Sequence, residues 1–310
     1  MDKLKEFEQI RIQRAKKAKL FLGLGFGFLG LAIILLTLSF LLALEIEYTY
    51  ILLMFALAVL IGAGGIVLLI VAAIYCAKWS NFFKNEVVKQ LMINEYPNCT
   101  YSPSKGIDKE IFFEPAFFRR PDIYNSSNYL YAFYENVKIE SADYLLQDRS
   151  RDSKGHVHYN TYAKGRFLRL SFCRSFKNTV KVTEKSGLFN FNFSTQYKKV
   201  ELESVDFNKK FLTLSTDDQA AFFILTPQIQ EEMLRLEKCF SGGIYFCFIE
   251  NHLFIAINNN ASSYSSNIFR PLSGDSLKKI IDEINIPKRF IDAFKLNREK
   301  YNMPNGNITI

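Results

Sequence analysis

The sequence predicts an α+β protein, in which an N-terminal two-helix transmembrane hairpin precedes a mainly antiparallel α+β cytoplasmic domain. Three observations lead to this prediction. Two long apolar runs without charged residues lie near the N-terminus and are joined by a very short acidic link. Basic residues flank this pair of runs and are absent from the link. Beyond residue 96, short segments rich in aromatic and β-branched residues alternate with polar turns and a few helical patterns.

The two apolar runs occupy residues 20–44 and 48–77. A bilayer core requires about 20 apolar residues at the rise of an α-helix, so each run is long enough to cross it. Inside lipid the backbone must satisfy its own hydrogen bonds, which requires both runs to be helical. The link Glu45-Ile46-Glu47 is long enough only to reverse the chain. Residues 20–77 are therefore expected to form a helical hairpin in the lipid bilayer.

The charges that flank the hairpin predict its orientation. The basic residues on the two flanks are Lys3, Lys5, Arg11, Arg14, Lys16, Lys17, Lys19, Lys78, Lys84 and Lys89. Because positive charge is retained on the cytoplasmic side, both termini are expected in the cytoplasm. The basic segment 1–19 would also attract anionic lipid, although orientation alone accounts for its charge. A cleavable signal peptide is the less favoured alternative for the first run, whose apolar stretch exceeds the usual core of about 7–15 residues.

Small residues recur four positions apart in both runs, as Gly23 and Gly27 in the first and Ala58 and Gly62 in the second. Such spacing lets two helices approach closely in lipid. Packing within the hairpin and formation of a homo-oligomer through these Gly-rich helices both remain open. Neither run contains Asp, Glu, Lys, Arg or His, which argues against a transporter or an ion pathway.

An amphipathic juxtamembrane helix is expected over residues 78–95. Trp79, Phe83, Val87 and Leu91 recur every four positions and predict one apolar stripe. This stripe has two alternative partners, the membrane surface or the domain that follows. The residue before a proline disfavours helical geometry, so the helix should end at Tyr96-Pro97.

Residues 96–310 are expected to form the cytoplasmic α+β domain. Aromatic and β-branched segments predict strands at residues 129–134, 137–140, 166–172, 179–183, 189–193, 244–249 and 253–257. The last two would form a hairpin around Glu250-Asn251-His252. Capping signals and apolar periodicity predict helices at residues 219–225, 228–239, 276–283 and 287–296.

The residues best suited to catalysis or metal binding form no recognisable active site. The five cysteines include no C-x-x-C pair and are expected to be reduced thiols. His156 and His158 lie in a polar stretch with no third metal ligand at a suitable spacing. Asp206, Asp217 and Asp218 are the best acidic candidates, but an aspartate before a helix is expected to act as its N-terminal cap. We therefore predict no catalytic, cofactor-binding or metal-binding residue, no cofactor, and no nucleic-acid partner.

Several motifs resemble a bacterial family. They are Tyr101-x-Pro103-x-x-Gly106-Ile107, Lys164-Gly165-Arg166-Phe167, the run from Val200 to Phe211, and Ser215-Thr216-Asp217-Asp218-Gln219-Ala220. Together they are similar to the membrane-protein family filed as domain of unknown function 3137. The resemblance implies two N-terminal transmembrane helices before the domain, located in a bacterial cytoplasmic membrane. It carries no catalytic residue and suggests a LemA-type membrane protein as a partner. A polar insert at residues 149–160 is longer than the family pattern leads us to expect.

Two classes of function follow from these observations. The favoured class is a membrane-anchored cytoplasmic binding or scaffold module of unknown ligand. The alternative is a membrane-tethered enzyme with an unrecognised active site in the cytoplasmic domain. The absence of catalytic motifs favours the binding module over the enzyme.

Overall fold

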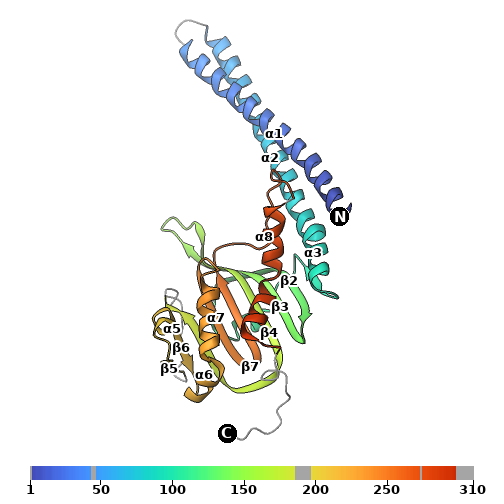
Figure 1. The fold of residues 1–310 in the computed structure, drawn as a ribbon. Coiled ribbons are helices and arrows are strands. Elements are labelled where there is room, and N and C mark those ends of the chain that lie inside the picture. The colour runs from blue at the N-terminus through green and yellow to red at the C-terminus, as the bar shows by residue number, and fades with distance from the viewer. Residues whose placement is uncertain (1, 43–46, 186–196, 273, 298–310) are drawn as a thin grey trace. The chain divides into compact units, whose positions relative to one another are not determined.

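The computed structural model describes residues 2–42, 47–185, 197–272 and 274–297, and it confirms the α+β class (Figure 1). The chain forms two compact units, which are described separately. The helical unit comprises Met1–Val88 and Ser265–Lys279. The sheet unit comprises Lys89–Tyr264 and Ile280–Ile310.

Two long helices form most of the helical unit. Helix α1 (Asp2–Leu41) joins the polar N-terminal segment and the first apolar run without a break. Helix α2 (Tyr48–Phe82) contains the second run and continues through a π-helical segment, η1 (Phe83–Val88), into α3 (Lys89–Glu95). The predicted helices are confirmed, whereas most of the predicted acidic link lies outside the described residues.

The closest approach of α1 and α2 occurs at Gly25 and Gly65, which belong to neither predicted pair, although Gly62 of the second pair also faces Ala32 of α1. A Cβ atom on Gly65 would lie 3.0 Å from the carbonyl oxygen of Gly25, and one on Gly25 would lie 2.7 Å from the side chain of Leu69. Gly23 and Gly27 have no atom of the other helix within 4 Å of such a position. The close approach therefore depends on Gly25 and Gly65, and the predicted Gly23/Gly27 pair lies on another face of α1.

The apolar stripe of the juxtamembrane helix is buried inside the protein. Trp79, Phe83, Val87 and Leu91 are each at most 7% exposed. The stripe therefore packs against other parts of the protein. The helix ends at Glu95, as the following Tyr96-Pro97 predicts, and the Tyr96 hydroxyl donates a hydrogen bond to the carbonyl oxygen of Ile284 at 3.0 Å.

The sheet unit is built on seven strands in the described part of the chain, and every pairing is antiparallel. The strands are β1 (Thr100–Ser102), β2 (Ile123–Tyr134), β3 (Val137–Arg151), β4 (Val157–Glu184), β5 (Lys198–Val200), β6 (Phe211–Ser215) and β7 (Gly243–Asn258). Their order is β1-β2-β3-β4-β6-β5, and β7 also pairs with β4. The long β4 is the central strand, since it pairs with β3, β6 and β7.

Two predictions about strand boundaries are wrong, for one physical reason. The segments predicted at 166–172 and 179–183 belong to the single strand β4, and the hairpin predicted around Glu250-Asn251-His252 is the uninterrupted strand β7. Glu250 has a φ of 49° and is paired with Phe176, where the ladder between the two strands changes register. The polar triplet is therefore a bulge, which places turn-like residues inside a strand.

The polar insert at residues 149–160 extends the sheet. The ladder between β3 and β4 continues from Arg149 paired with Tyr159 to Arg151 paired with Val157. Asp152 accepts hydrogen bonds from the backbone N–H groups of Lys154 and His156 at the tip. The insert is thus an exposed β-hairpin tip.

Six further helices lie beyond α3 in the described residues. They are α4 (Lys109–Phe113), α5 (Val205–Lys210), α6 (Asp218–Ile224), α7 (Pro227–Glu237), α8 (Asp275–Ile284), which crosses between the two units, and α9 (Ile286–Phe294). The helices α6 to α9 confirm the four that the sequence predicts, whereas α4, α5, β1, β5 and β6 have no counterpart among the predictions. The expected strand around Phe189, Phe191 and Phe193 lies outside the described residues.

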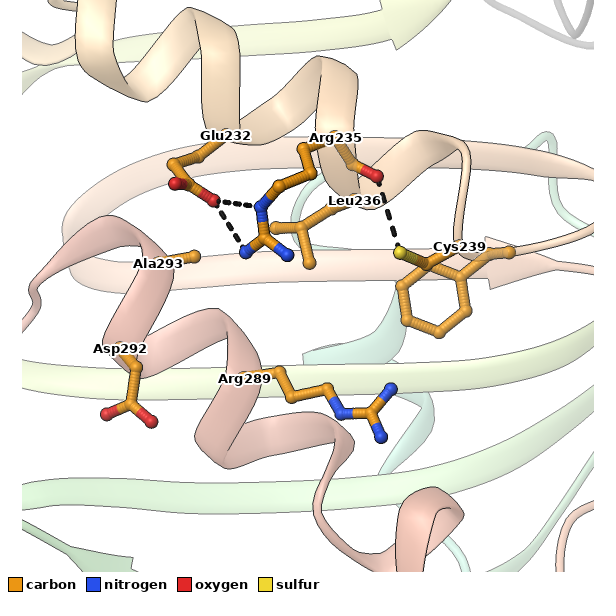
Figure 2. Close-up of a pocket in the computed structure, with 8 residues that line it drawn as sticks. Glu232, Arg235, Leu236, Cys239, Arg289, Asp292 and Ala293 are labelled. Carbon is orange, nitrogen blue, oxygen red and sulfur yellow. Dashed lines mark hydrogen bonds and ion pairs between the residues drawn. The ribbon is translucent and has the colours of Figure 1, made fainter. Parts of the chain in front are cut away.

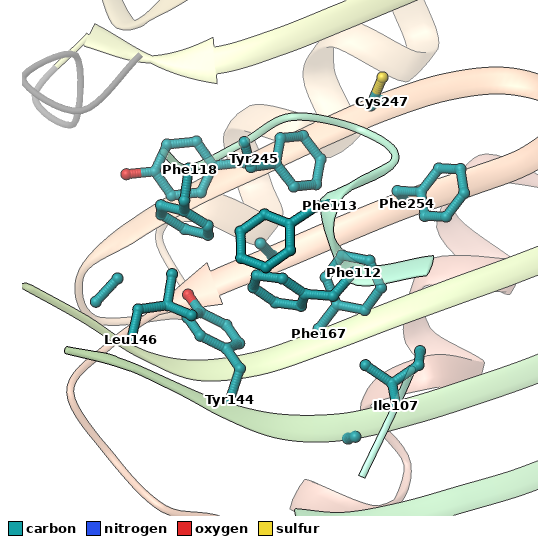
Figure 3. Packing of buried hydrophobic residues seen from close by; sticks show 14 residues of the cluster. Ile107, Phe112, Phe113, Phe118, Tyr144, Leu146, Phe167, Tyr245, Cys247 and Phe254 are labelled. Carbon is teal, nitrogen blue, oxygen red and sulfur yellow. The ribbon is translucent and has the colours of Figure 1, made fainter. Parts of the chain in front are cut away.

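An aromatic cluster forms the core on one face of the sheet (Figure 3). Phe112 of α4 packs against the rings of Tyr144 and Phe167, with centroids 5.0 and 4.9 Å away. Phe246, which follows the cluster residue Tyr245 in β7, contacts α9. Because side chains alternate along a strand, α4 and α9 cover opposite faces of the sheet.

Candidate functional site

A pocket of about 450 Å³ opens between α7 and α9 of the sheet unit (Figure 2). Its lining consists of Glu232, Arg235, Leu236, Cys239, Phe240, Arg289, Asp292 and Ala293. Each helix contributes an apolar wall and a charged edge, so the pocket has both an apolar and an ionic character.

Residues at their ends explain where helix α7 begins and where helix α9 ends. Pro227 occupies the first turn of α7, where its missing N–H costs no hydrogen bond, and Thr226 precedes it in extended geometry. Leu236 is buried on the inner side of α7. On the other helix, α9 ends at Lys295, whose φ of 52° is typical of a left-handed helix terminus. Phe240, just beyond α7, stacks on Phe290 of α9 with centroids 5.7 Å apart.

The charges at the edge of the pocket are nearly balanced. Arg235 binds Glu232 one turn away at 2.6 Å, and Arg289 binds Asp282 of α8 at 2.8 Å. Asp292 lies on the same helix as Arg289. Its pKa is raised, mainly by burial and to a smaller extent by the nearby carboxylate of Glu135. The edge therefore offers both donors and acceptors without a strong field of one sign.

The pocket contains no pair of groups suited to nucleophilic catalysis among its lining residues. The thiol of Cys239 is exposed and donates a hydrogen bond to the carbonyl oxygen of Arg235 at 3.4 Å. No histidine lines the pocket to accept a proton from this thiol. The arrangement can bind a partially apolar, polar-edged ligand, and it offers no evident reaction step.

Ser171 and His252 form a pair elsewhere that sequence inspection missed. The His252 Nδ1 lies 2.8 Å from the Ser171 Oγ, and its Nε2 lies 3.4 Å from the Arg169 guanidinium. Burial lowers the pKa of His252 to about 4, so the ring is neutral at neutral pH. Because Arg169 can only donate, Nε2 accepts and Nδ1 carries the proton, so the imidazole donates to the serine. This is the reverse of the arrangement that activates a serine nucleophile.

A buried ionic cluster surrounds Arg166, the arginine of the Lys164-Gly165-Arg166-Phe167 motif. Its guanidinium donates to the carbonyl oxygen of Glu283 at 2.6 Å, lies 3.7 Å from the Asp143 carboxylate and stacks 4.5 Å from the centre of the Tyr264 ring. Asp143 also accepts hydrogen bonds from Asn128 and from the backbone N–H of Ser263, at 2.7 and 2.8 Å. The cluster ties β3 and β4 to the loop after β7 and to α8.

The glycine that precedes this arginine has a packing role. A Cβ atom on Gly165 would lie 1.8 Å from the carbonyl oxygen of Ile257 in β7. Only a residue without a side chain lets β4 and β7 approach this closely at that position. The Gly-Arg motif is thus explained by the architecture of the sheet unit.

The acidic residues singled out from the sequence lie at the N-terminal ends of two short helices. Asp217 is the N-terminal cap of α6 and accepts from the backbone N–H of Ala220 at 3.3 Å, which confirms the predicted capping role. Asp218 lies in the first turn of the same helix. Asp206 is in the first turn of α5, exposed, with its carboxylate 3.5 Å from the Lys209 amine.

The two neighbouring histidines lie at the tip of the β3–β4 hairpin. His156 and His158 both contact the carboxylate of Asp152, at 3.1 and 3.4 Å. Hydrogen bonds to its carboxylate lower the pKa of Asp152, and the bond from the backbone N–H of His156 has the largest effect. Within the described residues, no group of three or more histidine, cysteine, aspartate or glutamate side chains could hold a metal ion.

Comparison with known proteins agrees with the resemblance found in the sequence. The model of the family described as Protein of unknown function (DUF3137) matches residues 161–296, which confirms the resemblance over a range that includes Arg166, α7 and α9. No curated protein matches the chain. Among solved structures, the mycobacterial trehalose monomycolate transport factor A, TtfA, is similar at 9% identity and a TM-score of 0.38, covering 73% of this chain and 99% of that protein.

Proposed function

We propose that this chain is a membrane-anchored binding module. The hairpin of α1 and α2 anchors it in the bacterial cytoplasmic membrane with both termini in the cytoplasm. The sheet unit recognises a protein partner through the pocket between α7 and α9.

The anchor is supported by the exposure of the hairpin's apolar side chains, the observation on which the proposal chiefly rests. Both helices are long and apolar enough to cross a membrane, yet only 11% of the most apolar stretch of α1 and 17% of that of α2 are buried. Phe26 and Leu60, for example, are 64% and 72% exposed. The central helix of a water-soluble protein would bury such residues, whereas a lipid environment accommodates them.

The charge distribution supports the orientation. Basic residues occupy the last turns of helix before Leu20 and the position directly after Ala77. The short link carries Glu45 and Glu47 and no basic residue. By the positive-inside rule, this asymmetry keeps the two termini on the cytoplasmic side.

The pocket supports the binding role. Its volume of about 450 Å³ is in the range of sites that hold ligands, and its balanced charges beside Leu236 and Phe240 suit a peptide segment with mixed apolar and charged side chains. A LemA-type membrane protein, which the family resemblance suggests, is the first partner to test. Self-association through the Gly23/Gly27 face of α1 is a second, independent contact in this proposal.

Site-specific photo-crosslinking in native membranes tests the binding role. A photoreactive phenylalanine analogue in place of Cys239, at the edge of the pocket, is expected to give a protein adduct on irradiation. The same analogue at Tyr159, an exposed residue of the β3–β4 hairpin, is the matched control and should not give that adduct.

Charge reversal sharpens the test. Combining Arg235→Glu with Arg289→Glu should abolish the adduct at position 239, whereas Arg151→Glu on the exposed hairpin should leave it intact. Equal adducts at positions 239 and 159, or an adduct that survives reversal of both pocket arginines, would contradict recognition at this pocket.

A further inference from the structure

Basic residues of both helices gather where the apolar runs of the hairpin end. This basic collar consists of Arg14, Lys16, Lys17, Lys19 and Lys78. The amines of Lys17 and Lys78 lie 5.9 and 6.0 Å from the centre of the Tyr75 ring, which places the two helices at the same level. No acidic residue occurs between Glu8 and Glu45 or between Glu47 and Glu86, so no acidic residue of either helix interrupts the collar.

A segment from the C-terminal part of the chain belongs to the helical unit and lies beside the hairpin (Figure 1). Arg11 donates a hydrogen bond to the carbonyl oxygen of Ile268 at 2.6 Å, and Glu8 accepts one from the backbone N–H of Leu272 at 3.0 Å. Glu8 and Arg11 also bind each other at 2.6 Å. With Ile268 only 3% and Leu272 only 9% exposed, residues 265–272 are held firmly against α1.

The docked segment places an aromatic ring beside the collar and has an exposed cation as its next residue. The Lys19 amine lies 5.9 Å from the centre of the Phe269 ring, and the next residue, Arg270, is exposed. Lys19 directly precedes Leu20, the first residue of the apolar run. Arg11 is eight residues earlier, so the helical rise places it about 12 Å from that boundary.

With the hairpin anchored as proposed, these positions bring Phe269 and Arg270 close to the lipid headgroups. The headgroup layer on one side of a bilayer is about 5–8 Å thick, and the surface potential extends about 8–10 Å further at physiological salt. An aromatic residue beside lysines and arginines is the composition that favours the membrane–water interface.

We infer that residues 265–272 form a second membrane contact, in which Phe269 and Arg270 join the basic collar to bind the headgroups of anionic phospholipids. Charge complementarity identifies the occupant, because the collar and Arg270 are all positive. This inference rests on the proposed anchor and its orientation. It adds a lipid-sensing contact made by a segment that is distant in sequence from the hairpin.

Hydrogen–deuterium exchange of the full chain in nanodiscs tests the inference. One disc contains phosphatidylcholine alone, and in the other part of that lipid is replaced by phosphatidylglycerol. Amide exchange in residues 265–272 is expected to be several-fold slower in the anionic disc, and added salt should remove the difference. Arg270→Gln should weaken the slowing by about fivefold, the effect of one charge near an anionic surface.

The control is Arg151→Gln, which removes another exposed arginine, in the sheet unit, and should leave the lipid effect unchanged. Equal exchange in the two discs by a chain that has inserted would overturn the lipid contact and leave the anchor intact. A slowing that persists fully in Arg270→Gln would also overturn it. Failure of the chain to enter either disc would instead contradict the proposed anchor.

Discussion

Replacing Arg166 by methionine is expected to destabilise the sheet unit by about 3–5 kcal/mol, as removal of one partner from a buried ion pair does. Arg166 is 5% exposed and Asp143 is 7% exposed, so the aspartate would lose its only nearby cation among the ion pairs of the described residues. The lost hydrogen bond to Glu283 would also release α8 from β4.

The buried thiol of Cys247 in β7 offers a direct measurement in the full chain, because it is accessible only when the sheet opens. Its labelling under conditions of rapid opening and closing should accelerate at least a hundredfold in Arg166→Met, since about 1.4 kcal/mol corresponds to a factor of ten. Arg151→Met on the exposed hairpin is the control and should have little effect. Adding Asp143→Asn should recover part of the loss, and a wild-type labelling rate in Arg166→Met would show that the cluster does not stabilise the sheet.

Truncating Phe112 to alanine is expected to cost about 3–5 kcal/mol, the usual range for a buried phenylalanine. The ring is 2% exposed and contacts Phe118, Tyr124, Tyr144 and Phe167, so its removal leaves a cavity between α4 and the sheet. Cys247 belongs to the same aromatic cluster and reports the change through its labelling rate.

Phe133→Ala is the matched control for Phe112→Ala. Phe133 is 56% exposed at the end of β2, and its truncation should change the stability by less than about 0.5 kcal/mol. Similar labelling rates for the two variants would contradict the assignment of Phe112 to the core.

The parts of the fold predicted correctly are those governed by local rules. The apolar runs, the helix end at Tyr96-Pro97 and the cap at Asp217 each depend on residues within one or two turns. The strand boundaries at Glu250 were wrong because a bulge and a turn have the same local composition. Only the pairing with Phe176 in β4, far away in sequence, distinguishes them.

The sites were less predictable because their residues are scattered. Arg235 and Arg289 carry no motif and meet only because α7 and α9 pack together. The segment around Phe269 contains Pro271 and lacks periodicity, so nothing local indicates that Glu8 will bind the backbone of Leu272. Arg166 was visible as part of a motif, but its partners come from β3, the loop after β7 and α8.

Thiol labelling in intact cells tests the membrane-anchored orientation most directly. A membrane-impermeant maleimide should label Glu47→Cys, in the link of the hairpin, from outside the cytoplasmic membrane. The native exposed thiols of Cys173 and Cys239 should react only after the membrane is permeabilised. Labelling of Cys173 and Cys239 in intact cells, with protection of position 47 until permeabilisation, would contradict the proposed orientation.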